Sequence, residues 1–220
     1  MPKPVTARLV ASALALAIAA PLAALPAASL AQSARTQGDA QAEAFVSTEA
    51  NRALGILGDG ALGAEAKKRA FRQFVDDVAD VPLVTGFVLG KYRRSITPAQ
   101  YAEFAQVFRL YANSVYETRL GLYKGEKLVV TGSTLRRPGD VVVSSQVTGG
   151  AQRQAVVVNW RVIKNDAGQW KAVDVQVQGV WLAITQRQDF GATLDNNNGN
   201  IAVLISQLRS QGAGGSARRG

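Results

Sequence analysis

The sequence has 220 residues and contains neither histidine nor cysteine. Hydrolases of the Ser-His-Asp or Cys-His type need an imidazole base beside the nucleophile, so that chemistry is excluded. Ordinary zinc and copper sites rely on His or Cys ligands, and disulfide bonds require Cys. We therefore expect no catalytic residues, no metal site and no cofactor, and we predict that the protein is not an enzyme.

Two short motifs resemble ligand-binding loops but lack the context that such loops need. Residues 58–63 spell Gly-Asp-Gly-Ala-Leu-Gly, the spacing of a dinucleotide-binding fingerprint, but they follow helical rather than strand periodicity. Residues 195–200 have the composition of a calcium loop, but Ser206 stands where a bidentate Glu is required. We interpret the first motif as a loop that ends a helix, and the second as a turn with Gly199 in a left-handed conformation.

One pair of carboxylates has a spacing that suits general acid–base work. Asp76 and Asp80 lie one helical turn apart. Lys and Arg residues surround them on the polar side of an amphipathic pattern, which is typical of a solvated, salt-bridged face. An enzyme would need a polar acid–base group deep in a pocket, and no such group stands out in the sequence.

The N-terminus has the order of features that marks a secretory signal peptide. Lys3 and Arg8 precede an apolar run at residues 9–20, and Ser29-Leu30-Ala31 offers small residues for cleavage before Gln32. The apolar run is shorter than the ~20 residues of a transmembrane helix, although an uncleaved anchor is the alternative. We predict a periplasmic protein, exported through a cleavable signal peptide and without stable membrane insertion.

Export also limits the partners that the basic composition suggests. The formal net charge is +9, and a basic protein invites a nucleic-acid interpretation. Because the chain is predicted to leave the cytoplasm, we expect no nucleic-acid partner. Anionic lipid headgroups, a membrane surface or acidic partner proteins remain as targets.

The middle of the chain divides into a helical part and a strand part. Helical periodicity groups Val46, Ala50, Ala53, Leu54 and Leu57, and then Ala70, Phe71, Phe74, Val75, Val78 and Val81. Pro82 interrupts the second pattern. A third helix is predicted to begin at Thr97, because Thr97, Pro98 and Gln100 form a capping box with Pro at the first helical position.

After Gly125 the apolar pattern alternates. Strands are predicted at 127–132, 139–148, 153–164 and 170–178, and two closing helices at 185–196 and 199–210. Short turns between the strands indicate hairpins and thus an antiparallel sheet. The predicted class is α+β, a curved antiparallel sheet wrapped by helices with an apolar pocket between sheet and helices. The predicted organisation is a signal peptide at 1–31, a flexible leader at 32–41, a single domain at 42–210 and a disordered basic tail at 211–220.

Apolar and aromatic faces are unusually extensive. The helix from Thr97 carries an aromatic stripe from Tyr101 to Tyr123, residues 83–89 are almost wholly apolar, and two strands present valine faces. These faces form either an ordinary core or the walls of a deep pocket for a hydrophobic ligand.

In order and spacing, several short stretches resemble one known family. They are Leu89-Gly90-Lys91-Tyr92, Thr97-Pro98-x-Gln100 with Phe104 and Phe108, Leu122-Tyr123-x-Gly125-Glu126, Trp170-Lys171-x-x-Asp174-Val175-x-Val177-x-Gly179-Val180, and Arg187-x-x-Phe190. The chain resembles the MlaC or toluene-tolerance family. These are periplasmic phospholipid-binding shuttle proteins of the outer-membrane lipid asymmetry pathway and auxiliary components of an ABC transporter.

The resemblance implies a fold with a nuclear-transport-factor-like sheet and added helices. It also implies a carrier that exchanges phospholipid between an inner-membrane MCE/ABC transporter complex and an outer-membrane lipoprotein–porin complex. Two positions depart from the family pattern: Trp181 replaces a small hydroxyl residue and Gln178 replaces a common acid. A hopanoid-like cargo is one alternative, and an adaptor that docks on membrane complexes without binding lipid is another.

These considerations give a set of candidate contact residues. We expect the following side chains to surround the lipid tails: Phe74, Val78, Phe87, Tyr101, Phe104, Phe108, Val143, Val156, Val158, Trp160, Val173 and Val175. Lys91, Arg93 and Arg94 are candidates for contact with a partner or with the lipid headgroup.

Overall fold

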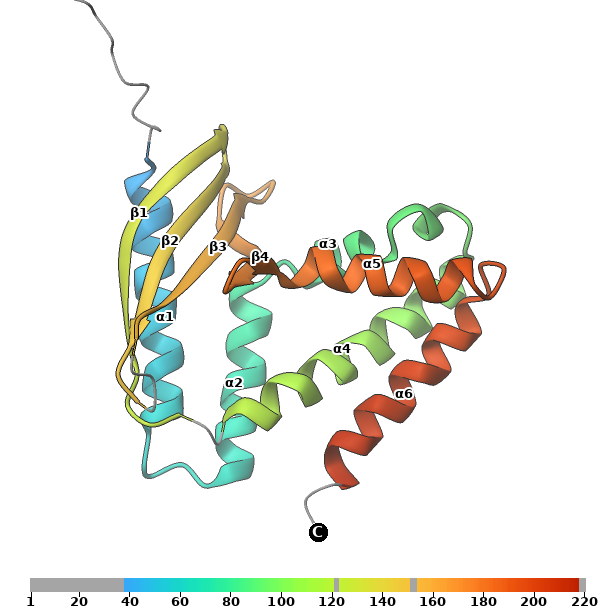
Figure 1. The fold of residues 1–220 in the computed structure, drawn as a ribbon, viewed down its shortest axis with the longest axis horizontal. Coiled ribbons are helices and arrows are strands. Elements are labelled where there is room, and N and C mark those ends of the chain that lie inside the picture. Colours follow the sequence, from blue (N-terminus) through green and yellow to red (C-terminus); the bar gives the residue numbers. More distant parts are fainter. Residues whose placement is uncertain (1–37, 121–122, 151–153, 218–220) are drawn as a thin grey trace, which may run out of the picture. The chain divides into compact units, whose positions relative to one another are not determined.

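A computed structural model describes residues 38–120, 123–150 and 154–217 (Figure 1). The predicted signal peptide and leader residues 32–37 lie outside the described residues. The helices are α1 (Ala40–Gly58), α2 (Ala64–Val78), α3 (Val81–Leu89), the 3₁₀ helix η1 (Gly90–Arg94), α4 (Pro98–Leu120), α5 (Leu182–Asp195) and α6 (Ile201–Ala217). The strands are β1 (Lys127–Arg137), β2 (Asp140–Thr148), β3 (Val156–Lys164), β4 (Trp170–Val177) and β5 (Val180–Trp181). Helices, then strands, then helices confirm the α+β class.

Capping residues set the starts of the helices. The Gln100 N–H donates to Thr97 Oγ1 at 3.2 Å, and the Thr97 N–H donates to Gln100 Oε1 at 2.9 Å. The predicted capping box of α4 is therefore confirmed. Asp80 accepts from the Leu83 N–H at 2.9 Å and begins α3, so Pro82 lies in the first turn of a new helix. Asp80 is thus a cap, and it does not share helix α2 with Asp76.

The sheet is an antiparallel meander in the order β1-β2-β3-β4-β5. The hairpins expected from the turn residues are confirmed. The first strand, predicted to end at Gly132, continues to Arg137, because the register shifts between Val130 and Gly132. Gly132, whose φ is 142°, is accommodated at this irregularity, and the hydrogen-bonded pairing of β1 with β2 continues beyond it.

Within the described part of the chain, most buried apolar side chains fall into two separate groups. The sheet cluster joins Ala42 and Val46 of α1 to Val141, Val143 and Val162 of β2 and β3. The helical cluster lies among α3, α4, α5 and α6 and contains Val88, Leu89, Phe104, Val107, Phe108, Ala183, Phe190, Leu194, Ile201, Leu204, Ile205 and Leu208. In Figure 1, α1 lies against the sheet, whereas α4 and α6 run side by side.

An ion pair joins the start of β2 to β3. Arg161 donates from Nε and from its terminal nitrogen to the two carboxylate oxygens of Asp140, at 3.0 and 2.9 Å. Asp140 is buried at 3% exposure. The Arg161 hydrogen bonds lower the pKa of Asp140, with further help from the charges of Arg136 and Arg137. Asp140 is therefore held as a paired carboxylate.

Both ends of the predicted domain differ from expectation. Helix α1 begins at Ala40, so the last residues of the predicted leader, 32–41, are already helical. The Asp39 side chain caps this helix by accepting from the Gln41 and Ala42 N–H groups. At the other end, α6 continues to Ala217, well into the segment 211–220 that was expected to be a disordered tail.

Candidate functional site

A cavity of about 330 Å³ lies among α2, α3, α4, α5 and the end of the sheet at β4 and β5. Most of its wall is apolar. The apolar lining residues are Val75, Ala79, Val81, Val84, Val88, Phe108, Tyr111, Ala112, Val115, Ala172, Val173, Val175, Val180, Leu182 and Ala183. The polar lining residues are Asp76, Arg109, Asn113, Asp174, Thr185, Gln186 and Asp189. An apolar pocket with few polar groups suits a hydrophobic ligand.

The inner wall of the cavity is the surface of the helical cluster. Val88, Phe108 and Ala183 are buried members of that cluster and also line the cavity. Phe108 stacks on Phe104 with ring centroids 5.7 Å apart and meets Phe190 edge-on at 5.8 Å. These ring contacts hold the Phe108 side chain in place, so this wall is preformed.

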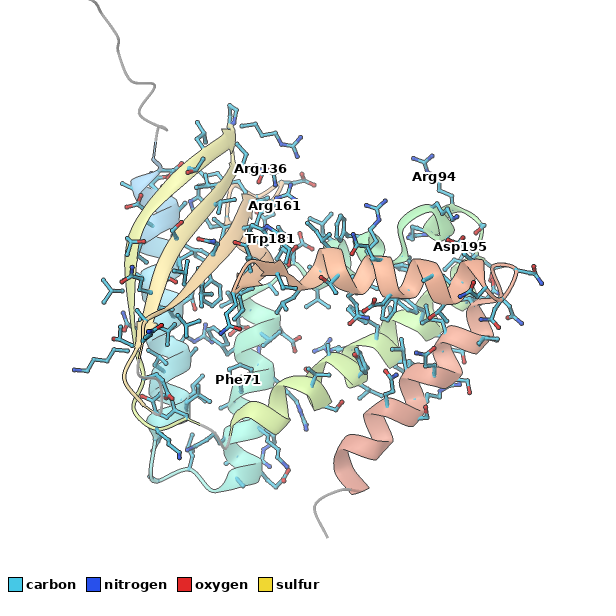
Figure 2. All side chains as sticks on the ribbon, viewed as in Figure 1. Phe71, Arg94, Arg136, Arg161, Trp181 and Asp195 are labelled. Carbon is cyan, nitrogen blue, oxygen red and sulfur yellow. The ribbon has the colours of Figure 1, made fainter. Side chains whose placement is uncertain are left out.

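The outer rim of the cavity is apolar and open to solvent. Val115, Val180 and Leu182 line the cavity and are 38%, 49% and 43% exposed. They come from α4, from β5 and from the start of α5. Trp181, the last residue of β5, lies at the junction of the sheet and α5 (Figure 2). Large exposed apolar side chains at a pocket opening are unfavourable in water and favourable against a hydrophobic ligand.

A β-bulge explains why four consecutive residues of β4 reach the cavity. Arg161 pairs with Asp174 and Val162 pairs with Ala172, so Val173 has no partner on β3. In a regular strand, successive side chains point to opposite faces. Here residues 172–175 all line the cavity, because the extra residue re-aims the side chains around it.

Asp174 is the buried carboxylate of this wall. Its Oδ1 accepts from the N–H groups of Ala183 and Val175, each at 2.8 Å. Ala183 lies in the first turn of α5, so Asp174 caps that helix from a neighbouring strand. Burial raises the pKa of Asp174, whereas these backbone hydrogen bonds and Arg161 act in the opposite direction. In a regular strand Asp174 would lie on the face opposite Val173 and Val175, whereas the bulge brings all three residues to the cavity.

The structure brings some of the predicted tail-contacting residues together. Phe108, Val173 and Val175 line the cavity. Phe104 is buried in the helical cluster, with Phe87 and Tyr101 packed against it.

The remaining predicted residues lie elsewhere. Val143 is buried in the sheet cluster and Trp160 packs against it, donating from Nε1 to Ser145. Val158 is buried, Val78 and Val156 are partly buried, and Phe74 packs under the guanidinium of Arg52. None of these six residues lines this cavity.

The predicted basic residues also lie outside the lining of the cavity. Lys91 Nζ forms an ion pair with Asp195 at 2.6 Å, and the Arg93 guanidinium lies 3.8 Å from the Tyr101 ring centroid. In Figure 2, Arg94 and Asp195 lie at the end of α5 remote from Trp181. These cations therefore occupy a surface separate from the rim.

Sequence reasoning missed Arg109 and Asp189, and it placed Asp76 on a solvated, salt-bridged face without linking it to a cavity. Arg109 of α4 pairs with Asp76 of α2, and both residues line the cavity together with Asp189 of α5. Helical spacing puts Arg109 on the same face as Ala112 and Asn113, which also line the cavity, but nothing in the sequence marked that face as part of a cavity. Within the described ranges, no group of three or more acidic, His or Cys residues is arranged to hold a metal ion.

The described helices include none that is long and apolar enough to cross a membrane. The fold and the cavity define an α+β protein with an apolar ligand pocket. The family model for the MlaC protein matches residues 29–210, and the chain therefore belongs to the MlaC family.

A solved structure supports the fold independently. A phospholipid-binding protein from Ralstonia solanacearum, determined in complex with a phospholipid, is similar with a TM-score of 0.70. The sequence identity is 24%, and the match covers 80% of this chain and 98% of the other. At that identity the likeness establishes the common fold.

Proposed function

We propose that this protein is a periplasmic carrier that takes the acyl chains of a phospholipid into the cavity and carries the lipid between membranes. The observation that carries this proposal is the apolar cavity of about 330 Å³, which opens to solvent through exposed valine and leucine side chains. Membership of the MlaC family and a solved relative in complex with a phospholipid support the ligand class.

The physical need for such a cavity follows from the cost of exposing lipid to water. At ~0.8 kcal/mol per CH₂, a 16-carbon chain costs about 13 kcal/mol to expose. A carrier must replace the bilayer around the tail while the headgroup stays in water. In this proposal the apolar inner wall surrounds the tail, and the headgroup lies near the charged residues Arg109, Asp76 and Asp189.

In this proposal, Phe108, Val173 and Val175 touch the tail directly, because they line the cavity. Phe104, Phe87 and Tyr101 support the wall from behind through the helical cluster. The other predicted tail residues belong to the sheet and to α2.

The family resemblance supplies the proposed route. The carrier would exchange lipid with an inner-membrane MCE/ABC transporter complex and an outer-membrane lipoprotein–porin complex. Lys91, Arg93 and Arg94 lie on a basic surface outside the lining of the cavity, which suits partner docking better than headgroup contact. The N-terminal pattern of charge, apolar run and small residues supports export.

The test is native mass spectrometry of the protein purified from cells after signal cleavage, followed by lipid extraction. A stoichiometric phospholipid adduct is the expected result. A hopanoid adduct would keep the carrier function but change the cargo. A mass that stays free of lipid after incubation with phospholipid vesicles would overturn the proposal and favour an adaptor that docks on membrane complexes.

A further inference from the structure

The charged residues that line the cavity are few and of mixed sign. Arg109 is the cation among the lining residues, and it forms an ion pair with Asp76 across α2 and α4. Their side chains are 52% and 28% exposed, so the pair lies at the solvent side of the cavity. Asp189 of α5 is also exposed and lines the same cavity. Among the described side chains, the solvent side of the cavity therefore presents one guanidinium and two carboxylates.

Asp76 and Asp189 differ in their pairing. Asp76 is already neutralised by Arg109, whereas no ion pair joins Asp189 to another residue in the described part of the chain. Asp174, the third carboxylate of the lining, is buried and engaged by backbone N–H groups. Asp189 thus carries the uncompensated negative charge of the rim.

The charge of Asp189 acts on the cavity wall. Tyr111, a lining residue of α4, has a raised pKa, first because of burial and then because of the negative charge of Asp189. The field of this carboxylate therefore reaches a side chain on the opposite helix of the cavity.

This arrangement favours one kind of headgroup. A phosphate can be bound by Arg109 in exchange for Asp76, since guanidinium groups hold phosphate oxygens through paired hydrogen bonds. A net anionic headgroup would add negative charge beside Asp189, whereas an amine on the same headgroup would offset that charge. The excess of carboxylates over cations among the described side chains at the solvent side of the cavity therefore selects against a second negative charge.

Resting on the proposed function, we propose that the cavity prefers zwitterionic phospholipids, with the phosphate on the Arg109 guanidinium and the ammonium on the Asp189 carboxylate. The basic residues of η1 do not alter this balance. Lys91 is paired with Asp195, Arg93 lies over the Tyr101 ring, and neither lines the cavity.

The test loads the purified, delipidated protein from vesicles that contain equal amounts of phosphatidylethanolamine and phosphatidylglycerol with identical acyl chains. The bound lipids are then extracted and their ratio is measured. Wild-type protein should bind more phosphatidylethanolamine. Asp189→Asn should lower that ratio by about two- to fivefold, the range of an exposed charge pair.

Asp166→Asn is the matched control. It removes the same charge from the exposed turn between β3 and β4 and should leave the ratio unchanged. An equal ratio in the wild-type protein, or the same ratio in Asp189→Asn, would overturn this inference and leave the carrier function intact. Failure of the wild-type protein to load either lipid would instead overturn the proposed function.

Arg109 is tested by competition between phosphatidylethanolamine and diacylglycerol with the same chains. Arg109→Gln should lose the preference for the phosphate-bearing lipid, whereas Arg136→Gln, at an exposed position of β1 outside the cavity lining, should keep it. Asp76→Asn frees Arg109 from its ion pair and should increase the preference, which gives a second test if Arg109→Gln fails to fold. An unchanged preference in a folded Arg109→Gln or Asp76→Asn variant would refute the role of Arg109.

Discussion

Filling the cavity from within should weaken lipid binding severely without unfolding the protein. Ala112 lines the cavity from α4, between Phe108 and Val115 on the same wall. The change Ala112→Trp adds an indole ring to a space of about 330 Å³. The ring would occupy room that the proposed acyl chain needs, while the buried helical cluster behind it stays intact.

The size of the effect follows from the methylene groups that the ring excludes. If the indole keeps roughly five CH₂ groups in water at ~0.8 kcal/mol each, binding weakens by about 4 kcal/mol. This corresponds to a loss of affinity of about a thousandfold. Ala112→Leu excludes fewer methylene groups and should give an intermediate loss.

The assay is lipid loading from vesicles, with extraction and quantification of the bound lipid, alongside a thermal melt of each variant. Ala102→Trp is the control, since it makes the same change on an exposed position of the same helix. It should load normally. A folded Ala112→Trp protein that loads as much lipid as the wild type would refute the assignment of the cavity as the binding site.

Three further predictions concern stability, each measured by urea unfolding. Asp140→Ala should cost about 3 kcal/mol at pH 7, because it leaves Arg161 without its buried partner. In the wild type, the pKa of Asp140 is lowered, so the stabilisation by the ionised carboxylate is present above the usual carboxyl pKa and is lost as pH falls through the lowered value. An equal cost of Asp140→Ala in strong acid would contradict this. The pKa of Asp174 is raised, so the wild type gains free energy of unfolding as pH falls through the raised value, whereas Asp174→Asn cannot take up that proton. Asp174→Asn should therefore become less stable relative to the wild type at lower pH. A pH-independent difference would show that Asp174 has an ordinary pKa. Phe104→Ala should lower the free energy of unfolding by about 3–5 kcal/mol. Lipid loading should persist in the folded fraction, because Phe104 lies behind the cavity wall. Loss of loading in fully folded protein would place Phe104 at the lipid.

The sequence was sufficient to predict features that depend on interactions between residues close together in the chain. Thr97 and Gln100 form the expected reciprocal hydrogen bonds, because a capping box involves residues only three positions apart. The hairpin turns were predictable for the same reason. Alternation of valines likewise identified the strands, and the antiparallel order followed from the short connections.

The charged side of the site was not predictable, because it depends on tertiary placement. The bulge at Val173 directs Asp174 inward, where it caps α5, and no periodicity in β4 signals an extra residue. Arg109 and Asp76 meet across two helices. Phe104 and Phe108 share one aromatic stripe, but only the packing of α5 decides which ring faces the cavity.

The sheet and the helical cluster differ in the sequence separation of their contacting elements, and this difference sets the order in which they assemble. The sheet is built from consecutive hairpins and can form once Trp181 is available. The helical cluster joins α4 to α6, whose residues Leu204 and Leu208 come late in the chain. Contacts between such distant segments form slowly. A chain that emerges N-terminus first therefore keeps the aromatic stripe of α4 uncovered until its last helix arrives, and a chain truncated before α6 would remain a substrate for chaperones and proteases.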